Sequence, residues 1–162
     1  MVYFMRHGQT DHNKENKWMG TLDIPLNEVG ISQAYSSIEN IKSLKIDIIY
    51  CSHLKRAIET SILIGNEINL PIIKDIRLNE RFLGQLEGMI KNSELLQNTD
   101  SIESELSIFL RVKSFLEELP NNKNILIISH SALFKIILKH NLISSKTSTI
   151  NNAQVVPINV LT

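Results

Sequence analysis

Cysteine is almost absent from this sequence, since Cys51 is the only one among 162 residues. A single cysteine cannot form an intramolecular disulfide, so the chain is not a disulfide-stabilised scaffold and suits a reducing compartment. Cys51 lies in an apolar run, where a free cysteine most often serves as a small buried hydrophobe. No apolar run is long enough to span a bilayer, and residues 1–5 show no feature of a secretory leader. We therefore expect a cytoplasmic protein with no membrane partner.

An excess of charge of either sign is also missing. The chain has 17 Lys and Arg against 17 Asp and Glu, so its formal net charge is zero. Sequence-independent binding to nucleic acid relies on a broad positive field, so we expect no nucleic-acid partner. Glycine and proline are scarce, at 6 and 4 residues, and hydrophobic residues make up 43%, which excludes a collagen-like or disordered chain. The length is that of one ordinary domain, and we expect a single domain over residues 1–162.

The chain does contain alternating strand and helix patterns. Short apolar runs rich in β-branched residues predict strands at 2–5, 46–51, 71–75, 124–129 and 153–160. Apolar residues at three- and four-residue spacing predict helices at about 31–41, 54–68, 101–119 and 132–140. Residues 76–100 are the least regular, with a helix expected only from about residue 90, and Pro157 favours an edge position for the last strand. The alternation predicts an α/β fold, namely a three-layer α/β/α sandwich with a mainly parallel central sheet.

Polar side chains recur at the carboxyl ends of the predicted strands, where the ligand site of an open α/β sheet lies. They are Arg6 and His7 after the first strand, Ser52 and Arg56 after the second, Glu80 after the third and His130 after the fourth. Two guanidinium groups directed at one point repel each other unless a dianion lies between them, and arginine forks match the oxygens of a phosphate. The pattern therefore predicts a phosphoryl site.

These residue types can support phosphoryl transfer. A histidine can attack phosphorus, because its neutral imidazole predominates near pH 7, and a carboxyl group can protonate the leaving oxygen and later take a proton from water. The arginines and the second histidine could supply the positive charge that a metal supplies elsewhere. A metal site of His7, Asp11 and His12 is an alternative, but its spacing fits no common metal motif and leaves the arginines without a role. We expect neither a metal nor a cofactor.

Five motifs follow one another along the chain. They are MRHGQTDHN at 5–13, MGTLDIPLNEVGISQA at 19–34, CSHLKRAIET at 51–60, RLNERFLGQLEG at 77–88 and IISHSALFKIIL at 127–138. In this order they resemble the motifs of the histidine phosphatase superfamily, also called the phosphoglycerate mutase-like family. The match covers nearly the whole chain and is far more specific than the Arg-His-Gly triplet alone, and it implies a phosphoglycerate mutase-like fold.

The resemblance also implies a role for each matching residue. His7 would be the phosphorylated nucleophile, with its tautomer fixed by a hydrogen bond at its other ring nitrogen, and Glu80 would be the general acid and base. The phosphoryl oxygens would be bound by Arg6, Arg56 and His130, with Asn13 as a further phosphate contact and the backbone at Gly20 and Ser131 bordering the ligand.

Some positions depart from the family pattern or leave a choice open. Ser131 replaces a glycine that commonly follows the second histidine, and His53 stands where proline is common. The phosphate site should survive the first change, because Ser131 still offers its backbone N–H. Glu87 is near enough in the sequence to compete with Glu80 for the acid role, and Trp18 either shapes the entrance or fills a small core of its own loop.

The length of one connection favours a phosphatase over a mutase. Residues 81–129 lie between Glu80 and His130, and the helix predicted to end at Leu119 needs most of them. The mutases of the family carry a longer insertion there, whose basic residues close over the site and keep water from the phosphohistidine. We expect a metal-independent phosphomonoester phosphatase acting on a small phosphorylated substrate or a phosphoprotein. A mutase and a non-catalytic binder of phosphorylated ligands stay open as alternatives, and the substrate and oligomeric state are not predicted.

Overall fold

The computed structural model describes residues 1–97 and 101–161 of the chain. Its strands form one sheet in the order β3-β2-β4-β1-β6-β5. The strands are β1 (Val2–Arg6), β2 (Ile48–Cys51), β3 (Ile72–Lys74), β4 (Ile125–Ser129), β5 (Ile143–Ser144) and β6 (Val155–Val160). Strands β1 to β4 run parallel, whereas β6 is antiparallel to both β1 and β5. The predicted α/β fold with a mainly parallel sheet is confirmed.

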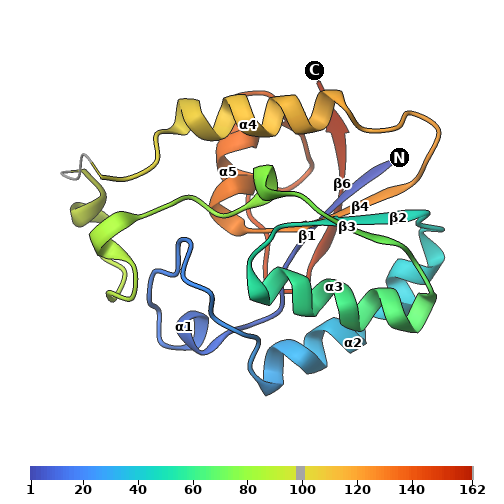
Figure 1. Ribbon diagram of the computed structural model, residues 1–162, viewed down its shortest axis with the longest axis horizontal. Helices are drawn as coiled ribbons and strands as arrows, with labels where there is room; N and C mark the ends of the chain where they lie inside the picture. Colours follow the sequence, from blue (N-terminus) through green and yellow to red (C-terminus); the bar gives the residue numbers. More distant parts are fainter. Residues whose placement is uncertain (98–100, 162) are drawn as a thin grey trace.

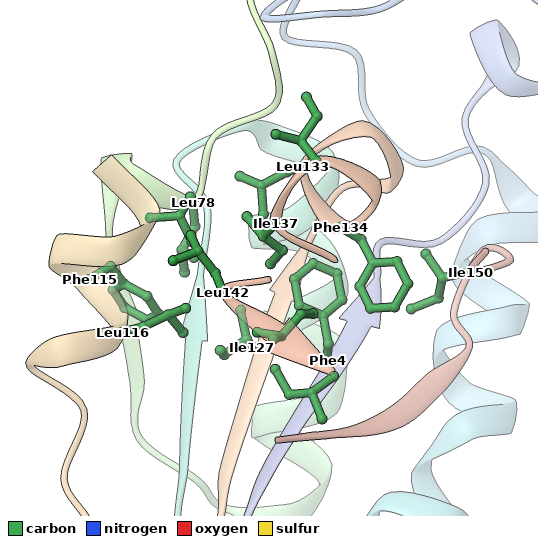
Figure 2. Close-up of a cluster of buried hydrophobic side chains, with 14 of the residues drawn as sticks. Phe4, Leu78, Phe115, Leu116, Ile127, Leu133, Phe134, Ile137, Leu142 and Ile150 are labelled. Atoms are coloured by element: carbon green, nitrogen blue, oxygen red, sulfur yellow. The ribbon is translucent and has the colours of Figure 1, made fainter. Parts of the chain in front are cut away.

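Helices cover both faces of this sheet (Figure 1). On one face lie α2 (Glu28–Ser43) and α3 (Lys55–Ile68), and on the other lie α4 (Glu105–Glu117) and α5 (Ser131–Lys139). Successive side chains of a strand point to opposite faces, so Phe4 belongs to the core beneath α4 and α5 and Met5 to the core beneath α2 and α3. Figure 2 shows the first of these cores, in which the rings of Phe4 and Phe134 lie 5.0 Å apart.

The central strand β4 is buried at every position, which explains its continuous β-branched sequence. Shorter elements complete the fold. They are the helix α1 (Asp11–Lys14) and the 3₁₀ turns η1 (Ile76–Leu78), η2 (Gly84–Leu86) and η3 (Ser93–Gln97). Within residues 1–97 and 101–161, no helix is both long and apolar enough to cross a bilayer.

The structure corrects the expected position of the last strand. Strand β6 is not at the edge, because β5, which the sequence does not predict, pairs with its far end. That pairing involves only Asn159 and Val160, whereas Pro157 pairs with Tyr3 of β1 alone. The proline therefore occupies the stretch of β6 without a second neighbour, where its missing N–H costs nothing.

Two helix starts are also corrected. Helix α2 begins at Glu28 rather than near Ile31, because the side chain of Asn27 accepts a hydrogen bond from Gly30 N–H and caps it. Helix α4 begins at Glu105 rather than at residue 101, and Ser104 serves as its N-terminal cap. The helix expected from residue 90 is limited to the turn η3, and residues 98–100 lie outside the described residues.

Candidate active site

A cavity of about 410 Å³ lies at the carboxyl end of the parallel strands and collects the predicted residues. Seven of them line it, namely Arg6, His7, Asn13, Gly20, Arg56, Glu80 and Ser131. The eighth, His130, is fully buried beside His7, with the two ring centroids 5.2 Å apart. The register explains this pairing, because Arg6 lies opposite Ser129 and the next residue along each strand is a histidine. The structure therefore brings all eight residues together.

Hydrogen bonds fix the tautomer of His7. Its Nδ1 lies 2.7 Å from the carbonyl oxygen of Gly8, which can only accept, so Nδ1 carries the proton of the neutral ring. The lone pair is then on Nε2, which accepts a hydrogen bond of 3.2 Å from Arg56 Nε. Burial lowers the pKa of His7 well below its usual value, and the charges of Arg56 and Arg6 lower this pKa further. His7 thus presents a neutral nucleophilic nitrogen to the cavity.

The two arginines provide buried positive charge. Arg56 is fully buried, and its terminal nitrogens donate to the carbonyl oxygens of Leu22 and Gly20, each at 2.8 Å. Burial lowers its pKa to about 10 despite the nearby charge of Glu80. In the described part of the chain, neither Arg6 nor Arg56 has a carboxylate oxygen within 4.0 Å. Two such charges without an ion pair favour a bound anion between them.

His130 is oriented by Ser52, whose Oγ lies 2.7 Å from His130 Nε2. Ser52 Oγ accepts from Leu54 N–H, and if its own proton is donated to Nε2, the ring proton of neutral His130 lies on Nδ1. His130 Nδ1 and Arg6 Nε are the two buried side-chain nitrogens without a partner among the described residues. Buried donors are normally hydrogen-bonded, so both nitrogens need a partner that the described residues do not supply.

The two glutamates that compete for the acid role occupy different places, and Glu80 is the one that lines the cavity. Its carboxylate accepts backbone hydrogen bonds of 3.1 to 3.2 Å from Leu133 and Ala132, in the positive first turn of α5. The carboxylate of Glu87 instead accepts from the backbone N–H groups of Thr21 and Leu83, and Glu87 itself is not among the residues that line the cavity. The cavity therefore contains Glu80 and not Glu87.

Asn13 and Gly20 hold the loop that follows β1. Asn13 Oδ1 accepts from Thr10 N–H, which caps α1, and from Asn152, whose amide also donates to the backbone oxygen of His7. Gly20 has a positive φ of 50°, and a Cβ there would collide with the carboxylate of Glu87. Only glycine fits at this position, which sets the carbonyl oxygen that Arg56 binds.

Several cavity residues are not predicted by the sequence. Three apolar residues form one part of its lining, namely Trp18, Leu83 and Leu96, and four cations form another, namely Lys17, Arg81, Lys91 and Lys135. Trp18 lines the cavity and also packs in a small cluster with Leu83 and Leu86. It therefore both shapes the entrance and fills a small core of its own loop. Each of these residues lies in a loop or on a helix flank, where no periodic pattern distinguishes it from surface.

The residues fit an anion better than a metal. Among residues 1–97 and 101–161, no three His, Cys, Asp or Glu side chains lie close enough to hold a metal ion. A second open cavity of about 520 Å³ lies over α2 beside Asn152, and its lining contains no arginine or histidine. The charge needed for a phosphoryl ligand is therefore concentrated in the first cavity.

Comparison with known proteins identifies the family. The description that matches is the histidine phosphatase superfamily (branch 1), over residues 2–160. The chain therefore belongs to this superfamily, and the enzyme class predicted from the sequence, a histidine phosphatase, is confirmed at that level. It is 33% identical to the uncharacterized phosphatase PhoE of Bacillus subtilis over 144 residues, which are 85% of this chain and 75% of that protein.

More distant similarity extends to mutases and to solved structures. A 2,3-bisphosphoglycerate-dependent phosphoglycerate mutase of Staphylococcus saprophyticus is 45% identical over 92 residues, which are 54% of this chain and only 40% of the mutase. Mycobacterial glucosyl-3-phosphoglycerate phosphatase superposes with a TM-score of 0.84 at 22% identity, covering 98% of this chain and 96% of that one. A putative α-ribazole-5′-phosphate phosphatase of Escherichia coli gives 0.80 at 23% identity, covering 99% and 94%. These two structures confirm the phosphoglycerate mutase-like fold.

Proposed function

We propose that this protein is a metal-independent phosphomonoester phosphatase that acts through a phosphohistidine on His7, with Glu80 as general acid and base. One observation carries the proposal. Among the described residues, the cavity joins a histidine whose Nε2 is unprotonated, two arginines without ion pairs, of which Arg56 is fully buried, and a carboxylate held beside them. A phosphoryl dianion matches this set, since its oxygens accept from both guanidinium groups while its phosphorus faces the nucleophile.

The reaction then takes two steps. In the first, His7 Nε2 forms a bond to phosphorus, the ester P–O bond breaks, and the acid form of Glu80 gives its proton to the leaving oxygen. In the second, the Glu80 carboxylate takes a proton from water as the water oxygen bonds to phosphorus and the N–P bond breaks. Arg6, Arg56 and His130 stabilise the charge on the phosphoryl oxygens in both steps. Inorganic phosphate leaves, and His7 and Glu80 return to their starting forms.

The substrate class we infer is a small phosphomonoester in the cytoplasm. The two solved neighbours described above are named as phosphatases of small phosphate esters, and an organic group could rest on the apolar lining at Trp18, Leu83 and Leu96. A mutase is the second candidate, because of the local identity to phosphoglycerate mutases. The two differ in whether water or a second substrate removes the phosphoryl group.

A rapid-quench experiment tests this proposal. With a ³²P-labelled phosphomonoester we expect an acid-labile phosphoenzyme that decays to inorganic phosphate in water, unchanged by EDTA. Replacing His7 by Ala should abolish the phosphoenzyme and reduce turnover by several powers of ten, as loss of a covalent catalyst does. Near-normal turnover in His7→Ala would contradict the mechanism, and phosphoryl transfer to a second substrate in preference to water would indicate the mutase. Phosphate binding with no phosphoenzyme on any phosphomonoester would indicate a binding protein.

A further inference from the structure

Glu80 lies in a segment with little regular structure, between η1 and η2. Its carboxylate is fixed by the first turn of α5, but the backbone that carries it needs an anchor of its own. Strand β4 supplies one contact, because Ser129 Oγ donates to the carbonyl oxygen of Leu78 at 2.7 Å. Further anchors come from Glu103, two residues before α4, and from Arg111 within α4, which packs against η1.

An ion pair between Glu103 and Arg111 forms these anchors. The guanidinium of Arg111 binds the Glu103 carboxylate with two hydrogen bonds, of 2.8 Å and 3.0 Å. The side chains are mostly buried, with exposed fractions of 19% for Arg111 and 17% for Glu103. A two-pronged pair of this kind fixes geometry better than a single contact, and solvent screens it less than a surface pair.

The pair reaches the Glu80 segment on both sides. Before Glu80, the remaining guanidinium nitrogen of Arg111, Nη1, donates to the carbonyl oxygen of Arg77. After Glu80, Glu103 accepts from Arg81 Nε at 2.8 Å through its backbone oxygen, and its backbone N–H donates to Phe82 O at 2.9 Å. Phe82 N–H also donates to the Glu103 carboxylate at 3.3 Å. Every one of these contacts is to a residue within three positions of Glu80.

We propose that the Glu103–Arg111 pair is the positioning device of the acid–base step, which sets where Glu80 stands relative to the leaving oxygen. This inference rests on the proposed function of Glu80. Neither residue lines the cavity, so neither touches the substrate, and both act through the backbone of residues 77–82. Loss of the pair should therefore impair proton transfer while the binding of phosphate at Arg6 and Arg56 is retained, since small displacements of a catalytic group are costly.

Leaving-group dependence tests the inference. An alkyl phosphate needs a proton on its leaving oxygen, whereas 4-nitrophenyl phosphate does not. For Arg111→Met we expect kcat/KM, which reports the first step and not the hydrolysis of the phosphohistidine, to fall roughly 10- to 100-fold with an alkyl phosphate and less than about 3-fold with 4-nitrophenyl phosphate. Competitive inhibition by inorganic phosphate should be unchanged. Glu103→Gln, which keeps the shape of the side chain, should give the same pattern if Arg111→Met does not fold.

Two controls separate positioning from general stability. Lys113→Met removes a cation from the same helix, where Lys113 pairs with Glu117 in solvent, and should leave both substrates unaffected. In a Glu80→Gln background, Arg111→Met should add almost nothing, because its effect passes through Glu80. If Glu80→Gln is selective for the alkyl phosphate but Arg111→Met slows both substrates equally, or adds to Glu80→Gln, the inference is wrong. If Glu80→Gln itself shows no selectivity, the proposed acid role is wrong instead.

Discussion

At the scale of the residue, the two buried histidines are chemically alike and are made different by one neighbour each. The carbonyl oxygen of Gly8 places the proton of neutral His7 on Nδ1 and leaves Nε2 unprotonated, whereas the ring of His130 shares a hydrogen bond with the hydroxyl of Ser52 at Nε2. The unprotonated nitrogen of His7 lies beside Arg56, and Nδ1 of His130 has no partner among the described residues. Burial lowers the pKa of both rings, and the neighbouring guanidinium groups lower these pKa values further. The neutral forms that the chemistry needs are therefore the forms that the fold stabilises.

The same lowering predicts how stability depends on pH. A histidine whose folded pKa lies below its unfolded value near 6.5 binds fewer protons in the folded state, so its contribution is complete above that pH and is lost as pH falls toward the folded pKa. Between pH 7.5 and 5.5 we expect the free energy of unfolding to fall by on the order of 1 kcal/mol for each of His7 and His130. Urea unfolding at each pH in a phosphate-free buffer measures this fall in the free energy of unfolding.

His7→Gln should remove about half of this dependence, because it removes one of the two titrating rings. His53→Gln is the matched control, since His53 is exposed and the substitution should leave the slope unchanged. A slope that His7→Gln does not alter would mean that folding does not lower the pKa of His7.

At the scale of the element, the sequence predicts the strands and the residues at their carboxyl ends better than any other part of the fold. Buried strands such as β4 carry a local signal in their own residues, and the parallel arrangement then brings His7 and His130 to one edge. Strand β5 and the correct place of β6 cannot be predicted from local sequence, because they depend on pairing between distant segments. The residues that line the cavity cannot be predicted for the same reason. Lys17, for instance, is placed by a bridge to Ile90, and nothing in either local sequence announces that contact.

The loops around this bridge form a small cluster separate from the two main cores. Trp18, Leu83 and Leu86 make up its buried part, with Ile102 packed against them. Local structure with few buried contacts opens before the cores do. Because Trp18 is the only tryptophan in the chain, its fluorescence reports this cluster alone. We expect its emission to change at a lower urea concentration than the far-ultraviolet circular dichroism, and coincident transitions would contradict this prediction.

At the scale of the whole molecule, positive and negative charges are equal in number but unevenly distributed. The formal net charge is zero, yet the cavity lining includes six cations and Glu80 as its one carboxylate, counting Arg6, Lys17, Arg56, Arg81, Lys91 and Lys135. Because the rest of the molecule adds no net positive charge, the positive cavity attracts an anionic substrate only over short distances. Composition excludes a broad basic surface correctly, but it cannot reveal this local concentration.

This local field predicts a dependence on salt. Raising NaCl from about 20 to 300 mM shortens the screening distance several-fold, so the KM for a dianionic phosphomonoester should rise roughly 3- to 10-fold while kcat changes little. The double substitution Lys91→Met with Lys135→Met should reduce this dependence, since both lysines line the cavity. Potassium sulfate is unsuitable for the assay because sulfate competes for the site. A KM that does not respond to NaCl would show that the outer cations do not attract the substrate.

The place of β1 in the sheet has a consequence for the order of events during synthesis. Its two neighbours, β4 and β6, pair with Val2 through Ile125 and Ile158, so both are made long after β1 itself. Asn152, which holds the backbone oxygen of His7, also arrives late. A growing chain on the ribosome therefore carries its arginine and histidine on a strand with no partner, and only segments translated much later can turn that strand into a working site.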